Sequence, residues 1–315
     1  MSVGIVLSAK GNEPEDDRRG CVVTQGGRGD QLAASPQATR WDRWIARLER
    51  RLYRNGWAAR LGCALGMPIS PRVRRHAVEL PDGPPADRPL RIAFASDFHA
   101  GPTTHPALLA AACAALHDAR PDLLLLGGDF VGADAAAVDA LTPLLGQVAA
   151  PLGRFAVLGN HDWWSSPGPI VNALTRAGVD VLINRNVRLA PPFDRVWICG
   201  LDDHSAGAPD AEAALQGAAG IRVVLMHSPS NLLDLGRRRF DLALCGHTHG
   251  GQVALPGGTP LVVAEGPLSR RYSRGRYNLD SGGVLIVSVG LGCTLLPFRT
   301  FAHPEILVCD VTRTG

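Results

Sequence analysis

Five short motifs in the sequence carry side chains that can bind metal ions. They are Asp97-Phe98-His99, Gly127-Gly128-Asp129, Gly159-Asn160-His161-Asp162, Met226-His227-Ser228 and Gly246-His247-Thr248-His249. Carboxylate, carboxamide and imidazole groups suit divalent ions of intermediate hardness such as Mn, Fe or Zn, and one carboxylate can bridge two ions roughly 3.5–4 Å apart. The residue types therefore predict a site for a pair of metal ions.

The motifs come at the ends of short apolar runs, at residues 92–95, 123–126, 155–158, 223–226 and 242–245. Runs of this length, closed by glycine and polar residues, are typical of buried strands in an α/β protein. Such folds build their sites at the C-terminal ends of the strands. We therefore expect the carboxylate and imidazole groups to converge in one cleft.

Other segments complete an alternation of strands and helices. We expect strands at 73–80, 181–183, 196–199, 284–289 and 306–309, and helices at 108–119, 136–147, 168–177 and 209–218. A strand followed by a helix, several times over, predicts a layered α/β sheet protein.

In this order the motifs resemble the signature of the calcineurin-like metallophosphoesterase superfamily: D-x-H, G-D, G-N-H-[DE], a lone His and G-H-x-H. The resemblance covers roughly residues 91–311. Within the superfamily the chain is similar to the bacterial YkuE/YaeI-type phosphodiesterase branch, through residues 246–253, Gly290-Leu291-Gly292, Leu296-Pro297 and Pro304-Glu305-Ile306. The resemblance implies a fold of two stacked mixed β-sheets flanked by helices, with the metals at one end.

The resemblance also implies a role for each polar residue of the motifs. One metal ion would be held by Asp97, His99 and His249, the other by Asn160, His227 and His247, with Asp129 bridging them; Mn is favoured over Fe or Zn. A hydroxide held between the metals would attack phosphorus in line. His161 would lie over the substrate phosphate and protonate the leaving oxygen, supported by Asp162.

Taken singly, these residues have simpler explanations. Asp97 or Asp129 could cap a helix after a strand, and Asn160-His161-Asp162 could be an ordinary turn. One histidine after an apolar strand, such as His227, is more often a hydrogen-bonded core residue than a ligand. The metal interpretation rests on the whole series of motifs.

The sequence says less about the substrate. Trp163 and Trp164 could form an apolar wall beside the phosphate or simply pack. Five arginines of the late loops could approach the cleft or remain solvated: Arg270, Arg271, Arg274, Arg276 and Arg299. The resemblance favours cleavage of a phosphodiester or pyrophosphate bond, for example in a nucleotide-sugar lipid such as UDP-diacylglucosamine. The alternatives are a phosphomonoesterase or protein phosphatase, a nuclease, and a non-catalytic binding module.

Composition limits the partners. A formal charge of +3 and a pI near 8.6 are too mild for a dedicated nucleic-acid binder. The resemblance implies a small phosphodiester or pyrophosphate substrate, and nothing in the sequence implies a partner protein. The seven cysteines show no C-x-x-C spacing, and we find no secretory signal and no apolar run approaching 18 residues. These features predict a cytoplasmic protein.

The chain divides into three parts. Residues 1–40 have the composition of a disordered extension, and residues 73–315 are predicted to form the metallophosphoesterase domain. Between them, residues 41–72 form a basic helical segment in which Trp41, Trp44, Ile45, Leu48 and Leu52 recur at helical spacing. Residues 41–66 could therefore lie on the inner face of the membrane as a peripheral contact, or dock on their own domain.

Overall fold

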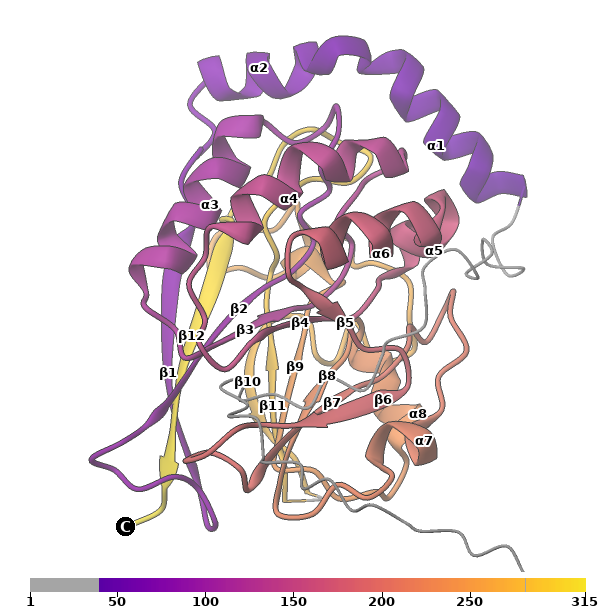
Figure 1. Cartoon of the computed structure of the whole chain (residues 1–315). Coiled ribbons are helices and arrows are strands. Elements are labelled where there is room, and N and C mark those ends of the chain that lie inside the picture. Colours follow the sequence, from indigo (N-terminus) through magenta and orange to yellow (C-terminus); the bar gives the residue numbers. More distant parts are fainter. Residues whose placement is uncertain (1–39, 281) are drawn as a thin grey trace, which may run out of the picture.

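The computed structural model describes residues 40–280 and 282–315, and two six-stranded β-sheets form its centre (Figure 1). The first sheet has the order β1-β12-β2-β3-β4-β5. Its strands are β1 (Arg72–Leu80), β2 (Leu90–Ala95), β3 (Leu123–Leu126), β4 (Arg154–Ala156), β5 (Asp180–Val181) and β12 (Glu305–Arg313). Strands β2 to β5 run parallel, and β12 lies antiparallel to β2.

The second sheet has the order β10-β11-β9-β8-β7-β6. Its strands are β6 (Arg185–Arg188), β7 (Val196–Gly200), β8 (Ile221–Leu225), β9 (Leu242–Cys245), β10 (Gly275–Asn278) and β11 (Val284–Val287). The middle four strands are parallel, and the edge strands β6 and β10 are antiparallel to their neighbours. Parallel strands place their C-terminal ends at one edge, so each sheet gathers its motifs on one side.

Helices cover the outer faces of the sheets. They are α3 (Pro106–Asp118), α4 (Val138–Gly146), α5 (Asn160–Ser165), α6 (Pro167–Arg176), α7 (Ala211–Leu215) and α8 (Leu232–Leu235), with short 3-10 helices at Ala135–Ala137, Pro229–Asn231 and His249–Gly251. The helices α1 (Arg40–Leu52) and α2 (Trp57–Ala64), joined by the 3-10 turn Arg54–Gly56, cross the end of the molecule above α3 and α4 (Figure 1).

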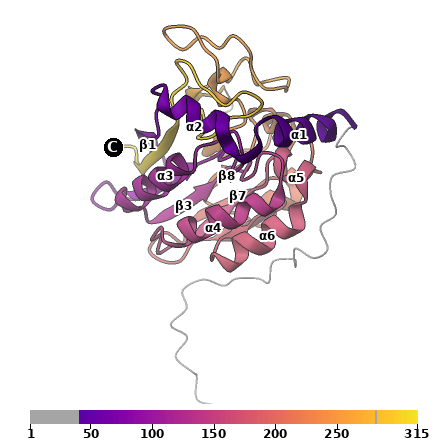
Figure 2. The ribbon, with the colours of Figure 1, turned by 90° about the horizontal axis from the view of Figure 1, so that it is seen from above.

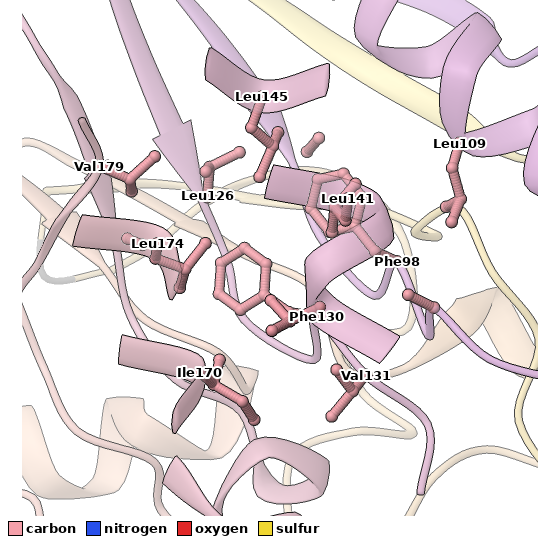
Figure 3. Packing of buried hydrophobic residues seen from close by; sticks show 14 of the residues in the cluster. Phe98, Leu109, Leu126, Phe130, Val131, Leu141, Leu145, Ile170, Leu174 and Val179 are labelled. Carbon is pink, nitrogen blue, oxygen red and sulfur yellow. The ribbon is translucent and has the colours of Figure 1, made fainter. Parts of the chain in front are cut away.

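Three apolar cores hold these layers together. The first lies between the first sheet and helices α3, α4 and α6, where Leu126, Leu141, Leu145 and Leu174 pack together (Figure 3). A second core fills the space between the two sheets, and a third covers the outer face of the second sheet. Because both faces of β3 are covered, all four of its leucines are buried, as its uniformly apolar sequence predicts.

The first core also positions the first two motifs. Phe98 and Phe130 stack with ring centroids 5.6 Å apart, and both are fully buried in the helix-side core (Figure 3). Each phenylalanine follows an aspartate of a motif, Asp97 or Asp129. Aromatic packing therefore anchors both loops while their aspartates face the other way, toward the second sheet.

Most expected elements are confirmed, with shifted ends. The strand expected at 155–158 ends at Ala156, and the helix expected at 209–218 shortens to α7, which Asp210 caps by accepting hydrogen bonds from the N–H groups of Glu212 and Ala213. The disorder predicted for the N-terminal extension lies outside the described residues, apart from Arg40, which begins α1. In the described part of the chain, no helix is both long and apolar enough to cross a bilayer.

Candidate metal centre and active site

Seven polar side chains from both sheets meet at one end of the sandwich. The loops after β2, β3 and β4 supply Asp97, His99, Asp129 and Asn160, and the loops after β8 and β9 supply His227, His247 and His249. All seven are buried. The first and last of these residues, Asp97 and His249, lie 152 positions apart in the sequence. None of the seven comes from the interior of an α-helix, because Asn160 is the first residue of α5.

The backbone of this centre has an unusual conformation. Five of the seven residues have positive φ: Asp97 (53°), His99 (43°), Asp129 (54°), His247 (70°) and His249 (53°). Residues with side chains rarely adopt this left-handed region, and such strain clusters at functional sites. The surrounding packing holds these loops where a relaxed loop would not place the side chains.

Glycines make the close approach of the loops possible. A Cβ atom on Gly159 would lie 2.2 Å from Oδ1 of Asp129, and one on Gly290, whose φ is +68°, would lie 2.6 Å from Cβ of Asp97. Neither position can take a side chain without displacing the aspartate. The Gly-rich segment near residue 290 therefore forms part of the support of the centre.

One group of ligand atoms consists of Asn160, His227 and His247. Nε2 of His227 and Nδ1 of His247 each lie 3.1 Å from Oδ1 of Asn160, and the two nitrogens are 3.2 Å apart. The opposite ring nitrogens bond the carbonyl oxygens of Gly127 and Glu265, both at 2.7 Å, so they must donate N–H. These bonds turn the remaining nitrogens inward, as in histidine ligands of metals.

The second group consists of Asp97, His99 and His249. Nε2 of His99 and Nε2 of His249 are 3.1 Å apart, and Oδ1 of Asp97 lies 3.6 Å from the latter. Asp129 lies between the groups, because its Oδ2 is 3.4 Å from Nε2 of His99 and 3.4 Å from Nε2 of His227. One carboxylate oxygen thus faces a ligand atom of each group.

The electrostatics of the centre suit cations. Burial lowers the pKa of His99 and of His249 well below the usual range of histidine, so both rings are neutral. Burial acts the same way on His227, but the carboxylates of Asp129 and Asp97 outweigh it and raise its pKa well above the usual value. The centre therefore needs positive charge beside Asp129, which a metal ion supplies in place of a proton. This donor set of imidazole, carboxylate and carboxamide fits a pair of divalent ions.

Arg299 supports the centre from behind. Its buried guanidinium lies 2.9 Å from Nδ1 of His249 and donates to the carbonyl oxygens of Val289 at 2.8 Å and Ala302 at 3.1 Å. It also donates to Gly292 and to the carbonyl of His249 itself. Among the late-loop arginines, sequence analysis left open which would approach the cleft, and the structure places Arg299 directly against a candidate ligand.

His161 lies at the mouth of the centre. Its Nδ1 bonds the carbonyl oxygen of Gly132 at 2.6 Å, its ring meets that of His99 edge-on with centroids 4.7 Å apart, and its backbone N–H donates to Oδ1 of Asp129 at 2.9 Å. A ring nitrogen of His161 lies within 4.8 Å of ligand atoms of His99 and Asp129. The ring is therefore oriented by a backbone carbonyl, next to the place where a substrate phosphate would meet the centre.

Asp162 acts on the backbone around His161. Its carboxylate accepts hydrogen bonds from the N–H groups of Phe130 at 2.9 Å, Val131 at 3.3 Å and Gly159 at 3.0 Å. Burial, reinforced by Asp129, raises the pKa of Asp162 to about 7. These bonds join the loop after β3 to the start of α5, which supports His161 through the loops.

The two tryptophans have different places. Trp163 is buried in the helix-side core, and its indole N–H donates to Oδ1 of Asp202 at 2.9 Å. Trp164 is half-buried and lines the cleft, with its ring centroid 4.9 Å from that of His161. The packing alternative thus describes Trp163, whereas Trp164 forms part of the wall of the cavity beside His161.

A cavity of about 770 Å³ opens over the centre. Besides the motif residues, its walls come from α1, from the loop after β3, from residues 262–265 and from residues 294–296. From α1, Arg47, Glu49 and Arg50 face this space, and Glu49 is buried there. The place of these residues in the cavity wall could not be predicted from the sequence, because the basic pattern of a helix does not show which of its faces packs on the domain.

The sequence of the chain is similar to those of known proteins. The family model for calcineurin-like phosphoesterases matches residues 90–251. The chain is 31% identical to the uncharacterized metallophosphoesterase YkuE of Bacillus subtilis, over 64% of this chain and 71% of that protein. It is 32% identical to the phosphodiesterase YaeI of Escherichia coli, over 71% of this chain and 82% of that protein.

Among solved structures, a 5'-nucleotidase precursor from Thermus thermophilus superposes with a TM-score of 0.44 at 19% identity, over 65% of this chain; the chain spans 50% of that longer protein. The match of the family model over half of the sequence, together with the two bacterial relatives, identifies the chain as a member of the calcineurin-like phosphoesterase family, and so as a hydrolase of phosphoric esters.

Proposed function

We propose that the protein cleaves a phosphodiester or pyrophosphate bond at two divalent ions held by the seven residues described above. The observation that carries the proposal is Oδ2 of Asp129, which lies 3.4 Å from a ring nitrogen in each of the two ligand groups. Bound there, two cations would lower the pKa of a water molecule and neutralise the charge of the phosphate. Mn is our preferred ion, since the carboxylate and carboxamide oxygens of the centre are ligands that suit it.

In this proposal His161 is the acid that protonates the leaving oxygen. The bond of its Nδ1 to the Gly132 carbonyl leaves the other ring nitrogen free for the substrate. Asp162 holds the two loops that carry His161 and Asp129 in register. The aromatic face of Trp164 adjoins the His161 ring and borders the space for the leaving group.

A diester or pyrophosphate is preferred over a monoester because of the space over the centre. A cavity of about 770 Å³, bordered by Trp164, Val262 and Leu295, has room for a large organic leaving group. The relative YaeI is described as a phosphodiesterase. A nucleotide-sugar lipid such as UDP-diacylglucosamine is a candidate substrate with such a leaving group. With a lipid substrate the protein would lie peripherally at the inner face of the membrane, in contact through residues 41–66.

The test is a comparison of two chromogenic substrates on the full chain with Mn supplied. We expect a higher kcat/KM for bis-p-nitrophenyl phosphate than for p-nitrophenyl phosphate, because only the diester places an organic group on both sides of phosphorus. Removing the metals with a chelator should abolish both activities. A clear preference for the monoester would contradict the reaction class while leaving the metal centre intact.

A further inference from the structure

Exposed apolar side chains gather at the end of the molecule where the cavity opens. Of the sixteen large apolar residues that are exposed within the described chain, fourteen belong to three segments, 44–69, 255–262 and 295–301. They are Trp44, Leu48, Leu52, Trp57, Leu61, Leu65, Ile69, Leu255, Leu261, Val262, Leu295, Leu296, Phe298 and Phe301. We call these three segments the rim face. Exposed apolar surface of this extent marks an interaction site.

Hydrogen bonds connect the two late loops of the rim face. The side-chain amide of Gln252 donates to the carbonyl oxygens of Thr294 at 3.0 Å and Leu296 at 2.8 Å, and the N–H of Ala254 donates to Thr300 at 2.9 Å. Viewed from above, α1 and α2 lie beside these late loops, coloured orange and yellow (Figure 2). The rim face is therefore one surface built from distant parts of the sequence.

The rim face continues into the catalytic cavity. Val262, Leu295 and Leu296 line the cavity and are also 70%, 50% and 44% exposed. An apolar group can therefore leave the cavity over its rim without crossing a polar surface. This arrangement suits a ligand with a phosphate at one end and an apolar tail at the other.

The positive charge of the rim face indicates which kind of partner it binds. Along its helices five arginines are exposed: Arg47, Arg50, Arg51, Arg54 and Arg60. The one acidic residue between positions 44 and 75, Glu49, is buried. Pairing with a second copy of the chain would bring two such arginine sets together, which like-charge repulsion opposes. Apolar side chains with two tryptophans amid arginines match the interface of an anionic bilayer.

We propose that the rim face docks on an anionic lipid bilayer and that the substrate is a phosphoester lipid whose head group enters the cavity over Val262, Leu295 and Leu296. The substrate class rests on the proposed phosphohydrolase function, whereas the docking surface does not. The proposal extends beyond the N-terminal helices, because the loops 255–262 and 295–301 contact the bilayer as well.

The first experiment measures sedimentation of the full chain with phosphatidylcholine vesicles that contain or lack phosphatidylglycerol. We compare the parent with L61E/L65E on α2 and its continuation, with F298E/F301E on the late loop, and with L233E, which changes an exposed leucine on α8 outside the rim face. Both double variants should lower the partition coefficient about tenfold or more, since charge replaces inserted apolar area. The L233E control should bind like the parent.

The second experiment uses hexadecyl p-nitrophenyl phosphate embedded in the same vesicles, beside soluble bis-p-nitrophenyl phosphate. The parent should show about a tenfold higher kcat/KM for the embedded diester, and F298E/F301E should lose that preference while retaining hydrolysis of the soluble one. If neither diester is cleaved but the vesicles bind, the enzymatic proposal fails and the docking surface stands.

Three outcomes overturn the proposal. They are that the parent fails to sediment with anionic vesicles, that only the helix variant loses binding, and that analytical ultracentrifugation shows a dimer that the variants dissociate. The second outcome would confine the membrane contact to the helices, and the third would make the rim face a contact between copies of the chain.

Discussion

His161 is the residue at which metal binding and catalysis can be separated. Its ring contacts the Gly132 carbonyl and the rings of His99 and Trp164, and its backbone N–H donates to Asp129. It belongs to neither ligand group of the proposed centre. We expect H161A to keep both metal ions and to lose roughly 100- to 10,000-fold in kcat, the usual scale for a positioned acid. Metal analysis and steady-state kinetics measure the two effects.

The matched control is H303A, which removes an exposed histidine. It should leave both kcat and metal content unchanged. Loss of metal in H161A would mean that His161 is itself a ligand, and unchanged turnover with a poor leaving group would remove it from the mechanism.

Arg299 allows a second prediction at the same scale. Lysine keeps the charge but cannot contact His249 and bond several carbonyl oxygens at once. We expect R299K to weaken binding at the His249 site by about 10- to 100-fold, the usual effect of losing a partner of a ligand. Mn titration with elemental analysis should then find close to one tightly held ion per chain.

The control for this variant is R276K, on an exposed arginine of β10. A general loss of packing in R299K would weaken both ions together and lower the melting temperature of the metal-free protein. Two ions retained with parental affinity would show that Arg299 plays no part in holding His249.

The seven proposed ligands could be picked out in the sequence because each one comes within a few residues of the end of a buried strand. Arg299 could not, because its contact with His249 depends on how a loop 50 residues further along folds back. For the same reason the sequence could not separate Trp163 from Trp164: consecutive residues of a short helix face the core and the cleft in turn, and no periodicity is visible over six residues.

At the scale of elements, α1 is a wall of the active-site cavity. Glu49 holds it there, because its buried carboxylate lies 3.3 Å from the Thr103 hydroxyl, which also bonds the Cys293 carbonyl at 2.8 Å. Burial raises the pKa of Glu49, and the nearby charge of His161 and the bond from Thr103 oppose that shift. The Glu49 carboxylate therefore connects the position of α1 with the charge around His161.

We therefore expect E49A to lower kcat/KM for bis-p-nitrophenyl phosphate about 5- to 30-fold without loss of metal. The size corresponds to a lost hydrogen bond to a charged group, about 1–2 kcal/mol. Kinetics and metal analysis test the prediction, with E79A on the exposed side of β1 as the control. Parental kcat/KM in E49A would mean that α1 covers the cavity without shaping it.

The helical pattern of residues 40–60 predicted α1 correctly, but its environment required the fold. A stripe of apolar residues on a basic helix is compatible with a membrane and with docking on the domain. In the structure the helix docks on the domain with one side and leaves another exposed: Glu49 is buried against the domain, whereas Trp44, Leu48 and Leu52 are exposed. The edge strands β6 and β10 were not predicted, since four residues of mixed polarity carry no clear period.

At the scale of the whole molecule, the metal centre joins the two sheets. The loops of the first sheet contribute Asp97, His99, Asp129 and Asn160, and those of the second contribute the three remaining histidines. Away from this end, an apolar core fills the space between the sheets, with a few polar contacts at the edges such as that of Arg276 with the Ala77 carbonyl. Metal ions bound by both sheets would therefore tie the two halves of the sandwich together and stabilise the folded state over the unfolded chain.

Removal of the metals should lower the melting temperature. One ion at a free concentration 100 times its dissociation constant adds about 2.7 kcal/mol to the free energy of unfolding. For a domain of this size each kcal/mol corresponds to roughly 2–4 °C, so a chelator should lower the melting temperature by about 5 °C or more. Scanning fluorimetry before chelation, after it and after return of Mn measures the shift.

The variant D129A, which lacks the shared carboxylate, should show a much smaller response. If the parent keeps its melting temperature after elemental analysis has shown that both ions are gone, the centre does not hold the sheets together, and apolar packing alone determines the stability of the sandwich.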